Sequence, residues 1–139
     1  MRKSKGFTLI ELLIVIAIVA ILSAVVLIAV NPARQMKDAR NVERMAEVNA
    51  ILSAMSQYQV DNESLPTCVD TTATCIGTDA LCCDLTADLV TAGYIAEIPI
   101  GPGATCDATD TCYEVTKTAT DRITVSAAGA EDITISYTR

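Results

Sequence analysis

The N-terminal part of the chain is a long run of apolar side chains. From Leu12 to Val30 no residue is charged, and Ser23 is the one polar side chain. A helix of about 20 residues, each rising 1.5 Å, is long enough to cross the hydrocarbon of a bilayer. The pattern therefore predicts a transmembrane or assembly helix over residues 7–30.

A carboxylate, Glu11, stands at the head of this run. A charge inside the hydrocarbon costs about 2.5 to 3.5 kcal/mol, so an acid in that position indicates a partner and a function. Two plainer interpretations fit less well. An ordinary secretory signal has an apolar stretch of about 7 to 15 residues followed by a cleavage site of small residues. A plain membrane anchor would not need Glu11.

Apolar side chains recur every three to four residues from Ala33 to about Val60, which predicts an amphipathic helix. Asn31–Pro32 separates this segment from the first run. Because proline lacks an amide proton and its ring crowds the preceding turn, we expect a kink or a short break there. The two segments together predict a long helical spine, half in the membrane and half against a folded head.

One face of the amphipathic segment is predicted to be buried and the other charged. The charged residues lie largely off the apolar stripe, where Arg40 could pair with Glu43, and Arg44 with Glu47. The apolar stripe comprises Val42, Met45, Val48 or Asn49, Ile51, Leu52, Met55 and Tyr58.

A short helix is predicted over residues 84–93, after loops that bear cysteines. Leu85, Leu89 and Val90 share one face of this segment, and Gly93 is well placed to end it.

Three strands are predicted at the end of the chain, within residues 112–138. Apolar residues alternate in them, as Ile133, Ile135 and Tyr137 do in the last. We expect an antiparallel three-stranded sheet whose apolar face packs on the long helix, which makes the fold class α+β. The predicted strands are Cys112–Lys117, Arg122–Ala127 and Asp132–Thr138.

All six cysteines follow the helical spine, which is typical of a disulfide framework in an oxidising compartment. We favour a Cys106–Cys112 pair, because the short turn between them can bring them together. Six cysteines allow many connectivities, so the other pairings stay open. The candidates are Cys68, Cys75, Cys82, Cys83, Cys106 and Cys112.

Charge and residue content disfavour several classes of function. The net charge of −7 argues against general electrostatic binding of nucleic acid. The chain has no histidine, which excludes a histidine base or metal ligand. Serines lack a visible base partner, C-x-x-C is absent, and Cys68 and Cys75 have the wrong spacing for a zinc knuckle. The sequence therefore predicts that the protein is not an enzyme.

The segment Lys5–Ile16 resembles the class III signal of type IV pilin-like proteins. Three basic residues precede its central sequence, Gly6-Phe7-Thr8-Leu9-Ile10-Glu11. The resemblance implies that a prepilin peptidase removes a leader of residues 1–6 by cutting between Gly6 and Phe7. It also implies methylation of the new amine on Phe7 and a pilin-like fold, with the helical spine packed on a small sheet.

The same resemblance implies a structural subunit precursor. The mature chain would polymerise with copies of itself into a type IV pilus-like filament, with Glu11 of one subunit near the Phe7 amine of a neighbour. The implied partners are the prepilin peptidase, a pilus or secretion assembly platform, and the inner membrane before assembly; no nucleic acid is expected. The precursor would cross the inner membrane once with its head (31–139) outside, and then enter a surface pilus or a periplasmic pseudopilus.

Two alternative functions stay open. Residues 84–99 resemble the region before the variable loop of type II secretion major pseudopilins, so a secretion pseudopilin is one alternative. The Asp-Pro-Trp-Gly that typically follows in those proteins is replaced here by Ile100-Gly101-Pro102-Gly103. The other alternative is a minor or tip pilin that acts as a binding module through its cysteine-bound loops.

Calcium is the one cofactor that the sequence suggests. Asp107 and Asp110 offer two carboxylates in a flexible loop rich in carbonyls, which suits this ion. The major pseudopilins that the chain resembles carry a calcium site in the corresponding region. The plainer interpretation is a solvated acidic turn within a disulfide loop.

Overall fold

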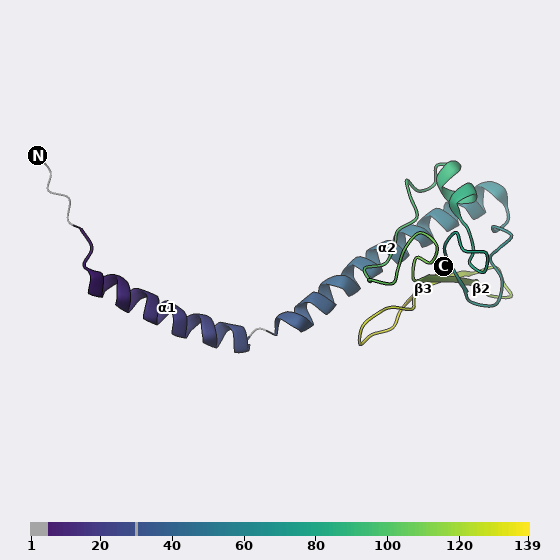
Figure 1. Ribbon diagram of the computed structural model, residues 1–139. Helices are drawn as coiled ribbons and strands as arrows, with labels where there is room; N and C mark the ends of the chain where they lie inside the picture. Colours follow the sequence, from purple (N-terminus) through teal and green to yellow (C-terminus); the bar gives the residue numbers. More distant parts are fainter. Residues whose placement is uncertain (1–5, 30) are drawn as a thin grey trace, which may run out of the picture. The chain divides into compact units, whose positions relative to one another are not determined.

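The computed structural model describes residues 6–29 and 31–139, and it divides into two compact units between Met36 and Lys37. Residues 1–5 of the predicted leader and Val30 lie outside the described residues. The N-terminal unit contains helix α1 and the second unit, the head, contains most of helix α2 and all that follows (Figure 1). The elements are α1 (Leu9–Ala29), α2 (Pro32–Asn62), β1 (Thr74–Cys75), η1 (Thr86–Thr91), β2 (Tyr113–Lys117), β3 (Ile123–Ala127) and β4 (Ile135–Thr138).

Helix α1 buries none of its 21 residues. Its length and composition are those of a helix that could cross a membrane. A helix from the core of a soluble domain would also be apolar, but it would be buried within the domain, and α1 is not. The apolar surface of α1 is therefore left for lipid or for another chain to cover.

Helix α2 begins at Pro32, where the sequence predicts a kink or a break. The Asn31 side-chain oxygen accepts a hydrogen bond from the Arg34 amide at 3.2 Å, and the Asn31 carbonyl accepts one from the Gln35 amide at 3.2 Å. Asn31 is thus the N-cap of α2. Proline is favoured as the first helical residue, because the amide it lacks would have no partner there. The Asn–Pro pair is a helix start.

The sheet has four antiparallel strands in the order β1-β2-β3-β4, where the sequence predicted three. The additional strand, β1, is only two residues long, which is too short to show an alternating pattern. Strand β4 begins at Ile135, three residues later than predicted. Of its expected apolar positions only Ile135 is buried, while Ile133 and Tyr137 are exposed.

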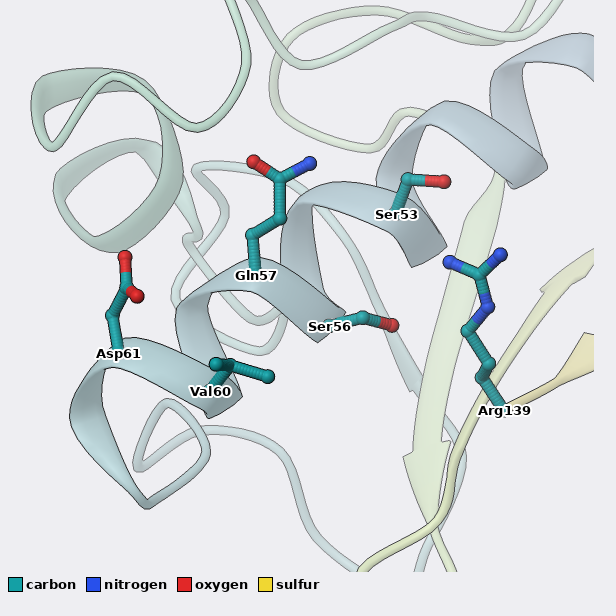
Figure 2. Close-up of a pocket in the computed structure, with 6 residues that line it drawn as sticks. All are labelled: Ser53, Ser56, Gln57, Val60, Asp61 and Arg139. Carbon is teal, nitrogen blue, oxygen red and sulfur yellow. The ribbon is translucent and has the colours of Figure 1, made fainter.

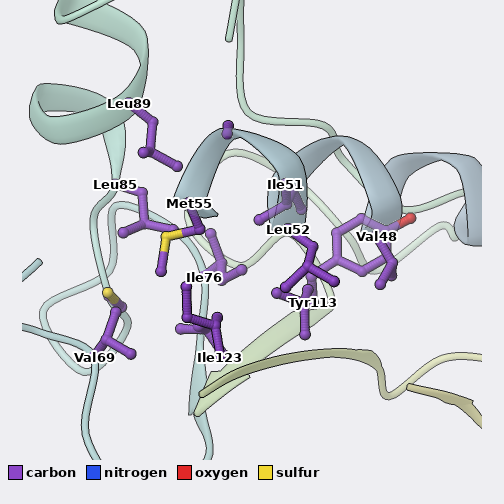
Figure 3. Packing of buried hydrophobic residues seen from close by; sticks show 14 of the residues in the cluster. Val48, Ile51, Leu52, Met55, Val69, Ile76, Leu85, Leu89, Tyr113 and Ile123 are labelled. Atoms are coloured by element: carbon purple, nitrogen blue, oxygen red, sulfur yellow. The ribbon is translucent and has the colours of Figure 1, made fainter. Parts of the chain in front are cut away.

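The core of the head lies between α2 and one face of the sheet, and η1 adds to it (Figure 3). Tyr113 is the largest fully buried side chain. Both Leu85 and Leu89, beside and within η1, are buried, and Gly93 has a φ of +86°, a conformation that suits glycine and ends the turn. The other fully buried large side chains are Val48, Ile51, Met55, Val69, Ile76, Val115, Ile123, Val125 and Ile135.

The buried face of α2 differs from the prediction at its N-terminal end. Val42 is 65% exposed, whereas Asn41 and Arg44 are buried. The loop between β3 and β4 causes the difference, because the Asn41 side chain accepts a hydrogen bond from the Glu131 amide at 3.0 Å and donates one to the Glu131 carbonyl at 2.6 Å. This loop covers Asn41 and leaves Val42 in solvent.

Arginines of α2 also pair across the fold, in place of the predicted pairs along the helix. The Arg40 guanidinium donates to both Glu131 carboxylate oxygens, at 2.6 and 2.8 Å. Arg44 donates to the Asn41 side chain at 2.9 Å and to the Pro102 carbonyl at 3.0 Å. We call this group of residues the Glu131 cluster; it consists of Arg40, Asn41, Arg44 and Glu131. Its hydrogen bonds hold the β3–β4 loop against α2, so β4 starts late.

Candidate functional site

The predicted cleavage junction lies just before α1. Gly6 and Phe7 are not helical and both are exposed, with 77% of Phe7 accessible to solvent. An exposed, non-helical segment is a preferred substrate for proteases. The geometry is therefore compatible with cleavage between these two residues.

Glu11 closes the first turn of α1 together with Thr8. The Thr8 hydroxyl accepts a hydrogen bond from the Glu11 amide at 3.3 Å, and the Glu11 carboxylate accepts one from the Thr8 amide at 3.4 Å. This reciprocal arrangement is a capping box, which satisfies two amides that a helix start leaves unpaired. The carboxylate also lies at the positive end of the helix dipole.

Thr8 is a residue that the functional interpretation of the sequence overlooked. The charge of Glu11 in an apolar run suggested a partner on another molecule, and the structure shows a partner within the same turn. The signal was available, because threonine followed three residues later by glutamate before an apolar run is the sequence signature of a capping box.

Comparison with known proteins identifies the N-terminal segment. Residues 1–27 match the family model for the prokaryotic N-terminal methylation motif. The type IV wide pilus major component PilA4 of Thermus thermophilus is 50% identical over 64 residues, which cover 46% of this chain and 47% of that relative. By this motif and this relative, the chain is similar to type IV pilins.

The pilin-like similarity covers part of the molecule only. The chain spans about half the length of the curated relative that it matches. No solved structure matches it. The cysteine-bound loops of the head must therefore be understood from their own geometry.

The six cysteines of the head form three disulfides. The structure pairs Cys106 with Cys112, as favoured from the sequence. The adjacent cysteines Cys82 and Cys83 bond to two different partners, Cys75 and Cys68. Two disulfides therefore close the loop of residues 68–83, and no cysteine within the described residues is free.

Hydrogen bonds join the two disulfide-closed loops of the head. The Thr78 amide donates to the Ala108 carbonyl at 3.0 Å, and the Asp79 amide donates to the Thr109 carbonyl at 3.1 Å. Beside them, Gly77 lies so close that an added Cβ would be 2.1 Å from the Thr109 carbonyl oxygen. Only glycine fits there, so the two loops form one rigid surface.

Asp107 and Asp110 shape the turn between Cys106 and Cys112. The Asp107 carboxylate accepts hydrogen bonds from the Thr109 hydroxyl at 2.5 Å and the Thr109 amide at 2.7 Å, which hold the pKa of Asp107 below its ordinary value. The Asp110 carboxylate accepts one from the Cys112 amide at 2.9 Å.

The calcium site at Asp107 and Asp110 that the sequence suggested stays a prediction. Calcium takes six to eight oxygen ligands, and one oxygen of each carboxylate accepts hydrogen bonds within the turn. In the part of the chain that the structure describes, no three acidic, cysteine or histidine groups gather in a way that could hold a metal.

Proposed function

We propose that this chain is the precursor of a structural subunit of a type IV pilus-like filament. A prepilin peptidase cleaves between Gly6 and Phe7 and methylates the Phe7 amine, and the mature subunit polymerises through α1. The observation that carries this proposal is the methylation motif attached to a helix whose apolar surface is entirely exposed. Such a surface needs lipid before assembly and neighbouring helices afterwards.

Glu11 has a specific role in this proposal. Its carboxylate already accepts a hydrogen bond from the Thr8 amide, one residue after the junction. Cleavage turns the Phe7 nitrogen into a cation, and methylation preserves that charge. In the filament, Glu11 of one subunit pairs with the Phe7 amine of a neighbour, so that both charges are neutralised in a region of low dielectric constant.

The proposed location follows from the two halves of the molecule. Before assembly α1 spans the inner membrane once, and the head lies on the outer side, where its three disulfides can form and persist. The assembly platform then moves the subunit into the filament. A surface pilus is favoured over a periplasmic pseudopilus because the curated relative is named a pilus major component.

Mass spectrometry of filaments sheared from cells tests the proposal. We expect the chain to be a dominant component that begins at Phe7, carries one N-terminal methyl group and retains three disulfides. A scarce chain would favour the tip subunit instead. A chain that is absent from surface filaments, or present in them with residues 1–6 intact, would contradict the proposal.

A further inference from the structure

A second feature of the head suggests how neighbouring subunits recognise one another. A groove of about 410 Å³ runs beside α2 and carries a carboxylate from each wall, Glu47 from α2 and Glu97 from the loop after η1. Its apolar lining consists of Ile98, Pro99 and Ile100. Two carboxylates and an apolar wall suit a side chain with a cationic head and an aliphatic stem.

The deeper carboxylate of this groove is fixed in place. The hydroxyl of Tyr113, whose side chain is fully buried, donates a hydrogen bond to the Glu47 carboxylate. Glu47 is therefore presented to the groove in a defined position, while Glu97 is exposed on the other wall.

Most cations of the head are already paired with acids of the same molecule. Lys37, Arg40, Arg44 and Lys117 all form ion pairs. Among the residues that the structure describes, the side chains with no such pair belong to Arg34, Arg122 and Arg139.

Arg139 lines a groove of its own. This groove, of about 470 Å³, is formed by Arg139 and by residues of the C-terminal part of α2. Figure 2 shows Arg139 on the opposite side of the groove from Asp61, with the hydroxyls of Ser53 and Ser56 nearer to it. The guanidinium of Arg139 is exposed and available to a second molecule.

We propose that Arg139 of one subunit inserts into the Glu47–Glu97 groove of a neighbouring subunit in the filament. This inference rests on the proposed function and names the contact between heads that accompanies packing of α1. The guanidinium lies between the two carboxylates, and its aliphatic stem lies on the Ile98–Ile100 wall.

The positions of the two grooves around α2 support a repeating contact. The two grooves share no lining residue, so they are two different surfaces of one subunit. A contact between two different surfaces is not completed by a single pair of subunits. It continues from copy to copy and builds an open helical assembly.

The overall charge explains why such a contact is needed. The chain carries 17 acidic and 10 basic residues, and removal of residues 1–6 takes away three of the basic ones. Acidic subunits repel one another when they are brought side by side. A cation of one subunit that enters a groove with two carboxylates on the next replaces repulsion with attraction where the heads meet. It also fixes the register of the heads.

Charge reversal in the full chain tests the pairing. We expect Glu97→Arg and Arg139→Glu each to lower the amount of sheared filament about tenfold or more, because each places like charges together. The double variant that exchanges the two charges should recover filaments about threefold or more over either single variant, but not completely, because Glu47 remains acidic. Glu97 is the preferred acid, since a change of Glu47 would also disturb the buried Tyr113.

Two matched controls separate the pairing from a general effect of charge. Arg122→Glu makes the same change just before Ile123, whose backbone pairs with that of Arg139. Glu43→Arg makes the reverse change one helical turn from Glu47. Both variants should assemble normally. The amount of each variant in the membrane is measured to confirm that the subunit is present.

The outcomes distinguish this inference from the proposed function. Normal filaments from Glu97→Arg or Arg139→Glu would overturn the pairing and leave the pilus proposal intact. A swapped variant that does not recover, or an Arg122→Glu variant as defective as Arg139→Glu, would also overturn it. A wild-type chain that forms no filaments would overturn the proposed function and the pairing together.

Discussion

The two helices of this protein show how differently apolar residues can be used. Helix α1 has 21 residues and buries none of them, while α2 has 31 residues and buries seven in the head. Within α2 the buried residues follow a helical stripe, and the opposite face is exposed. The apolar surface of α1 must be covered by lipid or by another chain, whereas the apolar stripe of α2 is covered by the rest of the head.

We infer from this difference that α1 serves assembly, whereas the buried core of the head serves folding. The N-terminal unit and the head are distinct compact units. A substitution in α1 should therefore change assembly without changing the stability of the head, and a substitution in the core should do the reverse. The changes described next test that separation, first for assembly and then for stability, each from the largest expected effect to the smallest.

The largest effect on assembly is expected from Glu11→Leu. The variant should still insert into the membrane, because it is more apolar than the wild type, but it lacks the carboxylate that we propose pairs with the Phe7 amine. We expect sheared filaments to fall about a hundredfold, a loss that corresponds to ~2.7 kcal/mol of pairing energy per subunit. Immunoblots of the sheared and membrane fractions measure both quantities.

Thr8→Ala is the control for helix capping. It removes the hydroxyl that accepts the Glu11 amide and retains the carboxylate. Loss of an N-cap side chain costs about 1 kcal/mol, so assembly should fall much less than in Glu11→Leu. Equal defects in the two variants would mean that Glu11 acts through the capping box, not through a neighbouring amine.

Removal of the Cys68–Cys83 disulfide should destabilise the head and leave α1 unaffected. The cross-link joins residues 15 apart, and closing a loop of that size contributes about 3 kcal/mol. Urea unfolding of the detergent-solubilised Cys68→Ala, Cys83→Ala variant should show that loss, with membrane insertion unchanged. The matched variant lacking Cys106–Cys112, whose residues are 6 apart, should lose less; an equal or greater loss would contradict the loop-length explanation.

Two valines of α2 allow a buried and an exposed apolar side chain to be compared within one helix. Val48 is fully buried and Val42 is 65% exposed. We expect Val48→Ala to lower the free energy of unfolding by about 1 to 2 kcal/mol, and Val42→Ala to change it by less than about 0.5 kcal/mol. Urea titration measures both, and a similar cost for the two would show that Val42 is buried in the folded protein.

These valines also show what the sequence could and could not predict. Helical periodicity identified Val48, Ile51 and Met55 as core residues, because they are buried by the helix stripe itself. It could not tell Val42 from Asn41, because the choice depends on a loop 90 residues away in the chain. Contacts between distant segments leave no local periodic signal.

The same distinction holds for the candidate sites. The spacing around Gly6, Phe7 and Glu11 is local, so the sequence alone was enough to predict a pilin-like N-terminus. The Glu47–Glu97 groove, in contrast, joins α2 to a loop 50 residues later, and a fold is required to bring the two acids together. The pairing of Cys82 and Cys83 with separate partners was likewise open until the loops were placed.

The smallest effect is expected from Glu131→Gln, which tests the polar cluster that displaced Val42. The hydrogen bonds from Arg40, and then the charges of Arg40, Lys37 and Arg44, hold the pKa of Glu131 below its ordinary value of 4.5. Because the folded-state pKa is the lower one, the ionised carboxylate stabilises the head above pH 4.5, and this contribution is lost as the pH falls through the folded-state value.

Thermal unfolding at two pH values measures this contribution. At pH 7, Glu131→Gln should melt a few degrees below the wild type, and at about pH 3 the difference should shrink toward zero. Glu114→Gln is the matched control, because it removes a carboxylate on β2 that makes no ion pair within the described residues. If the Glu131→Gln difference persists unchanged in acid, then the loop is held by the Asn41 hydrogen bonds to the Glu131 backbone, which do not depend on its carboxylate.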